Sequence, residues 1–255
     1  MNFKTFLAML ARDAHVARRN SVTLAFQILL QPMMFVFVFG RVMTVSGLMS
    51  AQYKALLLPG IIALSMIMCG TWAVTMPLIS EFQFTKEIED RLLAPMDLQW
   101  LAIEKVVAGM LQALVAGLFV IPCAWLVMGD VSLAGADPVM FIVIALLVSC
   151  LSATLGLLLG CSVGQQQVGL MFSMVMAPMI FFGCTYYPWT ALAKFPILKW
   201  VVLINPLVYA SEGFRSALVP QSPHLPKAAI LVALIAFNAA FLLLGLRQFK
   251  RKAIT

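Results

Sequence analysis

A dense run of charged residues in the first half of this 255-residue chain offers the most side chains for specific polar contacts. Its charged members are Lys86, Glu87, Glu89, Asp90 and Arg91. Among them Phe84, Ile88 and Leu92 recur at i, i+4 and i+8, which places three apolar side chains on one face of a helix. Pro95 cannot continue a helix. We therefore predict a short amphipathic helix over residues 83–94.

A helix of this kind needs a surface for its apolar stripe. The pattern leaves three surfaces open: the bilayer, the ends of neighbouring helices, and a soluble partner protein. A solvated connector, in which the charges only maintain solubility, is the fourth interpretation.

Motifs for binding a nucleotide or a metal ion are missing. No glycine is followed by lysine, so the chain lacks the loop that cradles nucleotide phosphates. The five cysteines form no Cys-x-x-Cys pair, and neither histidine is near them in sequence, which argues against a metal site or a disulfide framework. We expect no catalytic residue, metal or cofactor in this chain.

The elements that must position the charged helix are long and apolar. Hydrophobic residues make up 63% of the chain and charged residues 11%, against about 45–50% and about 25% in soluble domains. Six apolar segments contain no charged residue, and we predict that each is a membrane-crossing helix. They are residues 22–40, 56–78, 106–128, 139–163, 169–182 and 228–246. The sequence predicts a single all-α polytopic membrane domain, and the lack of charge within the spans argues against an ion-driven pump.

The distribution of basic residues predicts the orientation. Residues 2–19 carry Phe3, Phe6, Leu7 and Leu10 on one helical face, and we interpret them as an amphipathic helix on the cytoplasmic membrane surface; a frayed polar tail is the alternative. With the N-terminus inside, 11 Lys and Arg lie on the cytoplasmic side and 6 outside. Both termini are then cytoplasmic. The net charge of +7 matches contact with anionic lipids, and no basic stripe with interleaved aromatics indicates nucleic acid.

The segment before the last span is rich in aromatic residues and prolines. We predict that residues 184–227 form one or two short re-entrant helices at the outer face, with an aromatic belt at the interface. A seventh span over residues 199–218 is the alternative, but it would bury Glu212 and Arg215 in the membrane.

Two further patterns concern the bundle interior. Ser152, Gly156, Gly160 and Gly164 stand four residues apart on the fourth span, a spacing that favours close helix packing. Gln27 and Gln31 are polar groups at membrane depth and are candidates for lining a path, while Phe181 and Phe182 either gate its exit or anchor the bundle.

Three stretches of the chain resemble one family. QYKALLLPGI precedes the second span, EFQFTKEIEDRLLAPM contains the charged helix, and NPLVYASEGFR covers residues 205–215. In this order they resemble the permease subunit of ABC transporters of the type-2 exporter class. The daunorubicin-resistance and nodulation lipo-oligosaccharide permeases look similar. The third stretch carries the residues of the family's external motif: Asn205, Pro206, Tyr209, Glu212 and Arg215.

The resemblance implies a transport complex in the bacterial inner membrane. Two ABC ATPase subunits would bind below and supply ATP and Mg, and a second permease copy or a paralogue would complete the pair. Residues 83–94 would be the coupling helix seated in the ATPase. The cargo would be an amphipathic drug, a lipid or a lipid-linked glycan. A secondary transporter and a membrane-embedded enzyme or scaffold without an ATPase are the alternatives.

Overall fold

The structure is a computed structural model, and long helices account for most of it. It describes residues 30, 33–34, 36–43, 46–47, 52–83, 98–128 and 135–254. Within these ranges every regular element is helical. The predicted interfacial helix at residues 2–19, the greater part of the first predicted span and the charged helix at residues 84–94 lie outside the described residues.

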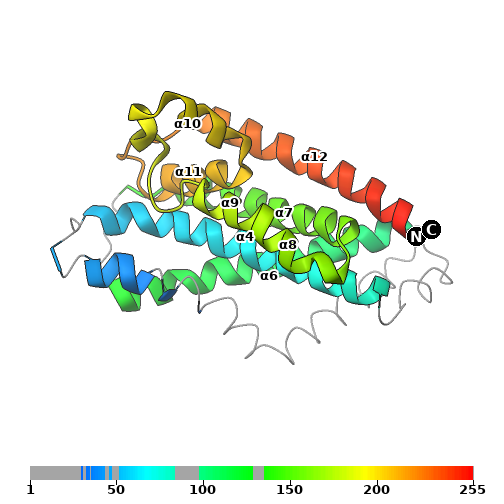
Figure 1. The fold of residues 1–255 in the computed structure, drawn as a ribbon. Helices are drawn as coiled ribbons and strands as arrows, with labels where there is room; N and C mark the ends of the chain where they lie inside the picture. Colours follow the sequence, from blue (N-terminus) through cyan, green and yellow to red (C-terminus); the bar gives the residue numbers. More distant parts are fainter. Residues whose placement is uncertain are drawn as a thin grey trace.

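The helix α4 (Gln52–Gln83) occupies the centre, with α6 (Leu98–Met128) and α7 (Pro138–Ser162) packed along it. The last helix, α12 (Lys227–Ile254), lies mainly against α7 (Figure 1). In the most apolar stretch of α4, 83% is buried, against 22% in α12. The chain therefore surrounds α4 with other helices and leaves most of α12 facing outward.

Small residues determine how closely α4 and α7 approach. A Cβ on Gly156 would lie 2.7 Å from the Thr71 carbonyl oxygen, so only glycine fits there. Two α4 hydroxyls also bond across the interface: Thr71 donates to the Ser152 carbonyl at 3.2 Å and Thr75 to the Gly156 carbonyl at 3.0 Å. Such contacts give the helices specificity where lipid offers no hydrophobic driving force.

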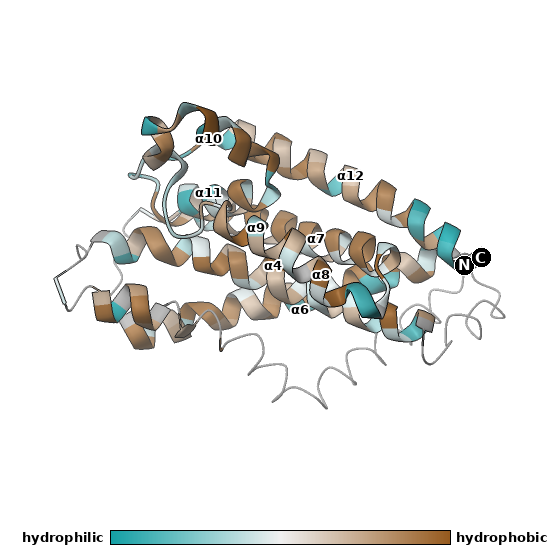
Figure 2. Cartoon of the chain, in the orientation of Figure 1, coloured by the Kyte–Doolittle hydropathy of each residue, from teal (hydrophilic) through white to brown (hydrophobic). Residues whose placement is uncertain are grey.

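Four helices among the described residues are long and apolar enough to cross a membrane. They cover Tyr53–Phe82, Gln99–Val127, Pro138–Ser162 and Lys227–Lys252. Figure 2 shows that most residues of these helices are hydrophobic, with hydrophilic residues at the C-terminal end of α12. These helices correspond to four of the six predicted spans, but they extend further. Glu81 and Lys105, which the sequence placed in a connection between spans, lie within α4 and α6.

The other two predicted spans are only partly represented. Of residues 22–40, the described part is a short piece that leads into the π-helix η1 (Val36–Val42). Residues 169–182 fall on α8 (Val168–Met171), η3 (Phe172–Met176) and α9 (Ala177–Phe181), which follow η2 (Gln165–Gln167). Together α8 to α9 are shorter than a typical crossing helix. The count of six spans stays a prediction.

The segment before α12 folds into short helices at one end of the bundle, opposite the C-terminal end of α12 (Figure 1). They are η4 (Trp189–Lys194), α10 (Pro196–Val201), η5 (Val202–Ile204) and α11 (Pro206–Leu218). The axis turns by 98° between Ile204 and Pro206. Residues 199–218 are therefore not one straight helix, although α11 does bury both charged residues that argued against a seventh span.

Candidate functional site

The last of these short helices, α11, carries a buried ion pair. Glu212 and Arg215 are one turn apart on α11, both are 0% exposed, and the Arg215 guanidinium donates to the Glu212 carboxylate. An isolated buried charge is very unfavourable, so such a pair persists only where further hydrogen bonds satisfy it. The surroundings of the pair supply these bonds.

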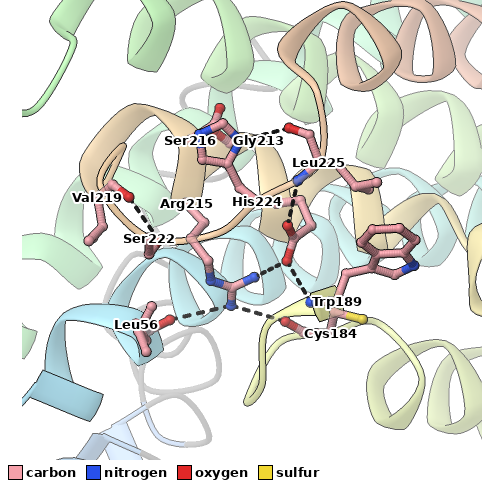
Figure 3. Close-up of polar contacts among 11 residues, drawn as sticks. Leu56, Cys184, Trp189, Gly213, Arg215, Ser216, Val219, Ser222, His224 and Leu225 are labelled. Carbon is pink, nitrogen blue, oxygen red and sulfur yellow. Dashed lines mark hydrogen bonds and ion pairs between the residues drawn. The ribbon is translucent and has the colours of Figure 1, made fainter. Parts of the chain in front are cut away.

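Both side chains bond to backbone groups that are distant in the sequence. The Glu212 carboxylate accepts from the amides of Trp189 at 2.9 Å and Leu225 at 3.1 Å. The Arg215 guanidinium donates to the carbonyls of Leu56 at 3.3 Å and Cys184 at 3.2 Å. Figure 3 shows the Arg215 side chain extending toward these two carbonyls. The pair thus joins α11 to the N-terminal end of α4 and to the chain segments on either side of α11.

The sequence at the start of α11 explains the sharp bend before it. Asn205 caps the helix, because its side-chain oxygen accepts from the Leu207 amide at 3.0 Å, and Pro206 occupies the first helical position. The Asn205 side-chain amide also donates to the Met179 carbonyl at 2.7 Å. Tyr209 donates its hydroxyl proton to the Leu203 carbonyl at 3.0 Å, which ties the two arms of the bend together. All five predicted external-motif residues therefore lie at this bend or on α11.

The turn after α9 forms a second contact with α4. A Cβ on Gly60 would be 1.9 Å from the Thr185 carbonyl oxygen, so the turn packs directly on helix backbone. Tyr53 donates to the Tyr186 carbonyl at 2.6 Å. Cys184 adopts a left-handed φ of 51°, and burial raises the pKa of its thiol to about 12. Burial therefore disfavours the thiolate form of Cys184.

The predicted coupling residues lie outside the described part of the chain, but the helix ends that flank them are visible. Glu81 near the end of α4 accepts from the Lys105 ammonium on α6 at 2.6 Å, with both side chains largely buried. Next to them Phe82 contacts Phe249 of α12 edge to face, with the ring centroids 5.6 Å apart. The end of α4, which precedes Phe84 in the chain, is therefore packed firmly against α6 and α12.

Two of the four candidate path residues fall within the described part of the chain. Gln27 and Gln31 lie outside the described residues. Phe181 and Phe182 are 69% and 47% exposed at the end of α9. Among the packing residues, Ser152, Gly156 and Gly160 lie in the contact with α4, while Gly164 follows the end of α7.

The sequence also holds a serine in a Gly-x-Ser-x-Gly pattern at residues 160–164. In serine hydrolases that pattern forms a sharp turn between a strand and a helix. Here Ser162 is the last residue of α7 and donates its hydroxyl proton to the Leu158 carbonyl at 2.7 Å. The pattern is thus a helix end. In the part of the chain that the structure describes, no group of His, Cys, Asp and Glu could hold a metal ion.

These features define a multi-pass helical membrane protein. Residues 4–219 match the family model of the ABC-2 type transporter, so the chain belongs to this family. It is accordingly the permease component of an ABC transporter, a transport subunit whose family works with an ABC ATPase. A comparison with curated proteins finds no significant match.

Proposed function

We propose that this chain forms the translocation path of an ATP-driven exporter whose ATP is hydrolysed by two separate ABC ATPase subunits. The observation that carries the proposal is the family match over residues 4–219, which includes the charged segment between α4 and α6. The missing phosphate-binding loop supports a motor on a separate subunit. A second permease copy or a paralogue would complete the path, with both termini in the cytoplasm of a bacterial inner membrane.

The coupling helix in this proposal is residues 83–94. Its apolar stripe (Phe84, Ile88 and Leu92) would pack in a cleft of the ATPase, and Glu87, Glu89, Asp90 and Arg91 would make polar contacts around it. The buried ion pair between Glu81 and Lys105 supports this role, since it fixes the ends of α4 and α6 that carry the helix. Movement of the ATPase would then reach α4 without being lost in a flexible connection.

The cargo is proposed to be amphipathic: a drug, a lipid or a lipid-linked glycan. The charges of the described spans lie near helix ends, and no Asp, Glu, Lys, Arg or His lies between Val106 and Met128 of α6 or within α7. A path for small ions or a proton relay would be expected to show such residues. In this proposal α10 and α11 are re-entrant helices in the outer leaflet.

The variant Ile88→Asp tests the coupling role. It places a charge on the apolar stripe, where burial against a partner is strongly unfavourable. In proteoliposomes that contain the permease and its ATPase, we expect export to fall at least tenfold while ATP hydrolysis continues. Ile88→Leu keeps the stripe apolar and serves as the matched control.

Two results would contradict the proposal. Normal export by Ile88→Asp would exclude residues 83–94 as the coupling helix. Cargo movement in nucleotide-free liposomes that contain this chain alone would favour a secondary transporter instead.

A further inference from the structure

A pocket of about 320 Å³ opens between the end of α7 and the last part of α12. This end of the bundle lies away from α10 and α11 (Figure 1). One wall is the end of α7, with Ser162 and Val163. The other wall is the last part of α12, with Gln248, Arg251 and Lys252. We refer to these five residues as the α7–α12 pocket. The permease function described above makes no use of it.

The inner face of α12 fixes the geometry of the pocket. Phe249 is 1% exposed and packs against Phe82, and a Cβ on Gly245 would lie 3.0 Å from the Leu157 side chain. These contacts set the rotation of α12 about its axis. Gln248 and Arg251 are one turn apart, so they share a face beside Phe249.

The pocket is strongly basic. Between Lys227 and Thr255 the chain contains no Asp or Glu, while Arg247, Lys250, Arg251 and Lys252 crowd the end of α12. The Lys252 ammonium lies 3.2 Å from the Gly160 carbonyl oxygen and 4.9 Å from the centre of the Phe82 ring. These contacts hold its positive charge at the wall of the pocket. An anion that entered would meet charge that is already in position.

The position of the pocket along α12 matches the level of lipid headgroups. The uncharged stretch from Ala228 to Leu246 is about 28 Å long at about 1.5 Å per residue, close to the hydrocarbon thickness of about 30 Å. Residues 248–252 then fall in the headgroup layer. Leu244, which is 47% exposed, lies four residues before Gln248 and seven before Arg251, on the same helix face. An apolar surface therefore leads from the pocket toward the acyl chains.

We propose that the α7–α12 pocket binds the phosphate headgroup of an anionic phospholipid, with an acyl chain lying along the Leu244 face of α12. The ligand is a resident lipid of the membrane and not the exported cargo. A free phosphate ion shares the headgroup chemistry but makes no use of the apolar face. Basic pockets between membrane helices are suited to such headgroups.

The test measures lipid binding to the purified full-length chain in detergent micelles by native mass spectrometry. Phosphatidylglycerol, phosphatidylcholine and inorganic phosphate are added in separate titrations. We expect saturable binding of phosphatidylglycerol and no displacement of it by millimolar inorganic phosphate. Arg251→Gln should weaken this binding at least about tenfold, because it removes a charge-assisted hydrogen bond to the phosphate. Lys250→Gln removes the same charge outside the pocket and should change binding less than twofold.

A second variant does not depend on Arg251. Gln248→Glu places a negative charge in the pocket at an exposed position and should weaken lipid binding at least fivefold. Equal weakening by Arg251→Gln and Lys250→Gln would overturn the proposal, because it would indicate diffuse attraction only. Displacement of the lipid by inorganic phosphate would also overturn it. Unchanged lipid binding in Arg251→Gln would overturn it as well. If that variant also lost a co-purifying protein, the pocket would be assigned to a protein contact instead.

Discussion

The buried pair of Glu212 and Arg215 allows a quantitative test of how the short helices before α12 are held in place. Arg215→Met removes the cation and leaves a carboxylate with 0% exposure. Loss of one partner of a buried ion pair costs about 3–5 kcal/mol. The carbonyls of Leu56 and Cys184 lose their charged donor as well. We therefore expect a loss of about 4–5 kcal/mol in the free energy of unfolding.

The second variant in the test removes the charge that Arg215→Met leaves behind. In Glu212→Gln combined with Arg215→Met, the side chain at position 212 is neutral and its remaining oxygen still accepts from an amide of Trp189 or Leu225. The double variant should be about 0.5–3 kcal/mol more stable than Arg215→Met alone, the range found for residues in one network.

The assay is unfolding of the full chain in mixed micelles with increasing sodium dodecyl sulfate, followed by circular dichroism. Lys194→Met, an exposed change on η4 in the same region, should stay within about 0.5 kcal/mol of the unaltered chain. The reasoning is refuted if Arg215→Met lies within 1 kcal/mol of the unaltered chain, or if the double variant is no more stable than the single one.

Two further predictions concern contacts at the same end of the bundle. Gly60→Ala would press a methyl group onto the Thr185 carbonyl and should cost about 1–3 kcal/mol in the same assay; Gly169→Ala, which meets no atom within 4 Å, should cost nothing, and equal losses would show that the packing argument is wrong. The hydrogen bond from the Met140 amide lowers the pKa of Asp137, so its stabilising contribution is present above the unfolded-state pKa and is lost as the pH falls through the folded-state pKa. The melting temperature of Asp137→Asn should therefore lie below that of the unaltered chain at pH 7 and converge with it in acid, and a gap independent of pH would contradict this.

The apolar spans could be predicted because an unbroken run of uncharged residues leaves few alternatives to a membrane helix. The ends of these helices could not be predicted. Hydropathy falls at the first charged residue, whereas the helix continues past it. Glu81 is an example: it ends the apolar run of α4 but stays helical and pairs with Lys105, 24 positions away. Nothing local in the sequence signals that pair.

The resemblance to the family identifies the residues of the external motif. It does not predict that Glu212 and Arg215 form a buried pair that holds α11 in place. Glu212 and Arg215, one turn apart, would ordinarily be interpreted as a solvated pair on a helix surface. Their burial depends on backbone groups at Leu56, Cys184 and Leu225, which only the folded chain brings together. The periodicity of apolar residues cannot predict contacts of this kind, because each contact joins single positions in different elements.

The two prolines inside α4 lie next to its two anchoring points. Pro59 follows Leu56, whose carbonyl holds Arg215, and Pro77 precedes Glu81, which holds Lys105. Each proline deletes one rung of the helical hydrogen-bond ladder, and helices bend most readily at such positions. Between them the helix is clamped by its close contacts with α6 and α7. The backbone of α4 is therefore least supported by its own hydrogen bonds beside each anchoring point, where side chains from other elements hold it, and its middle is held by the packing of neighbouring helices.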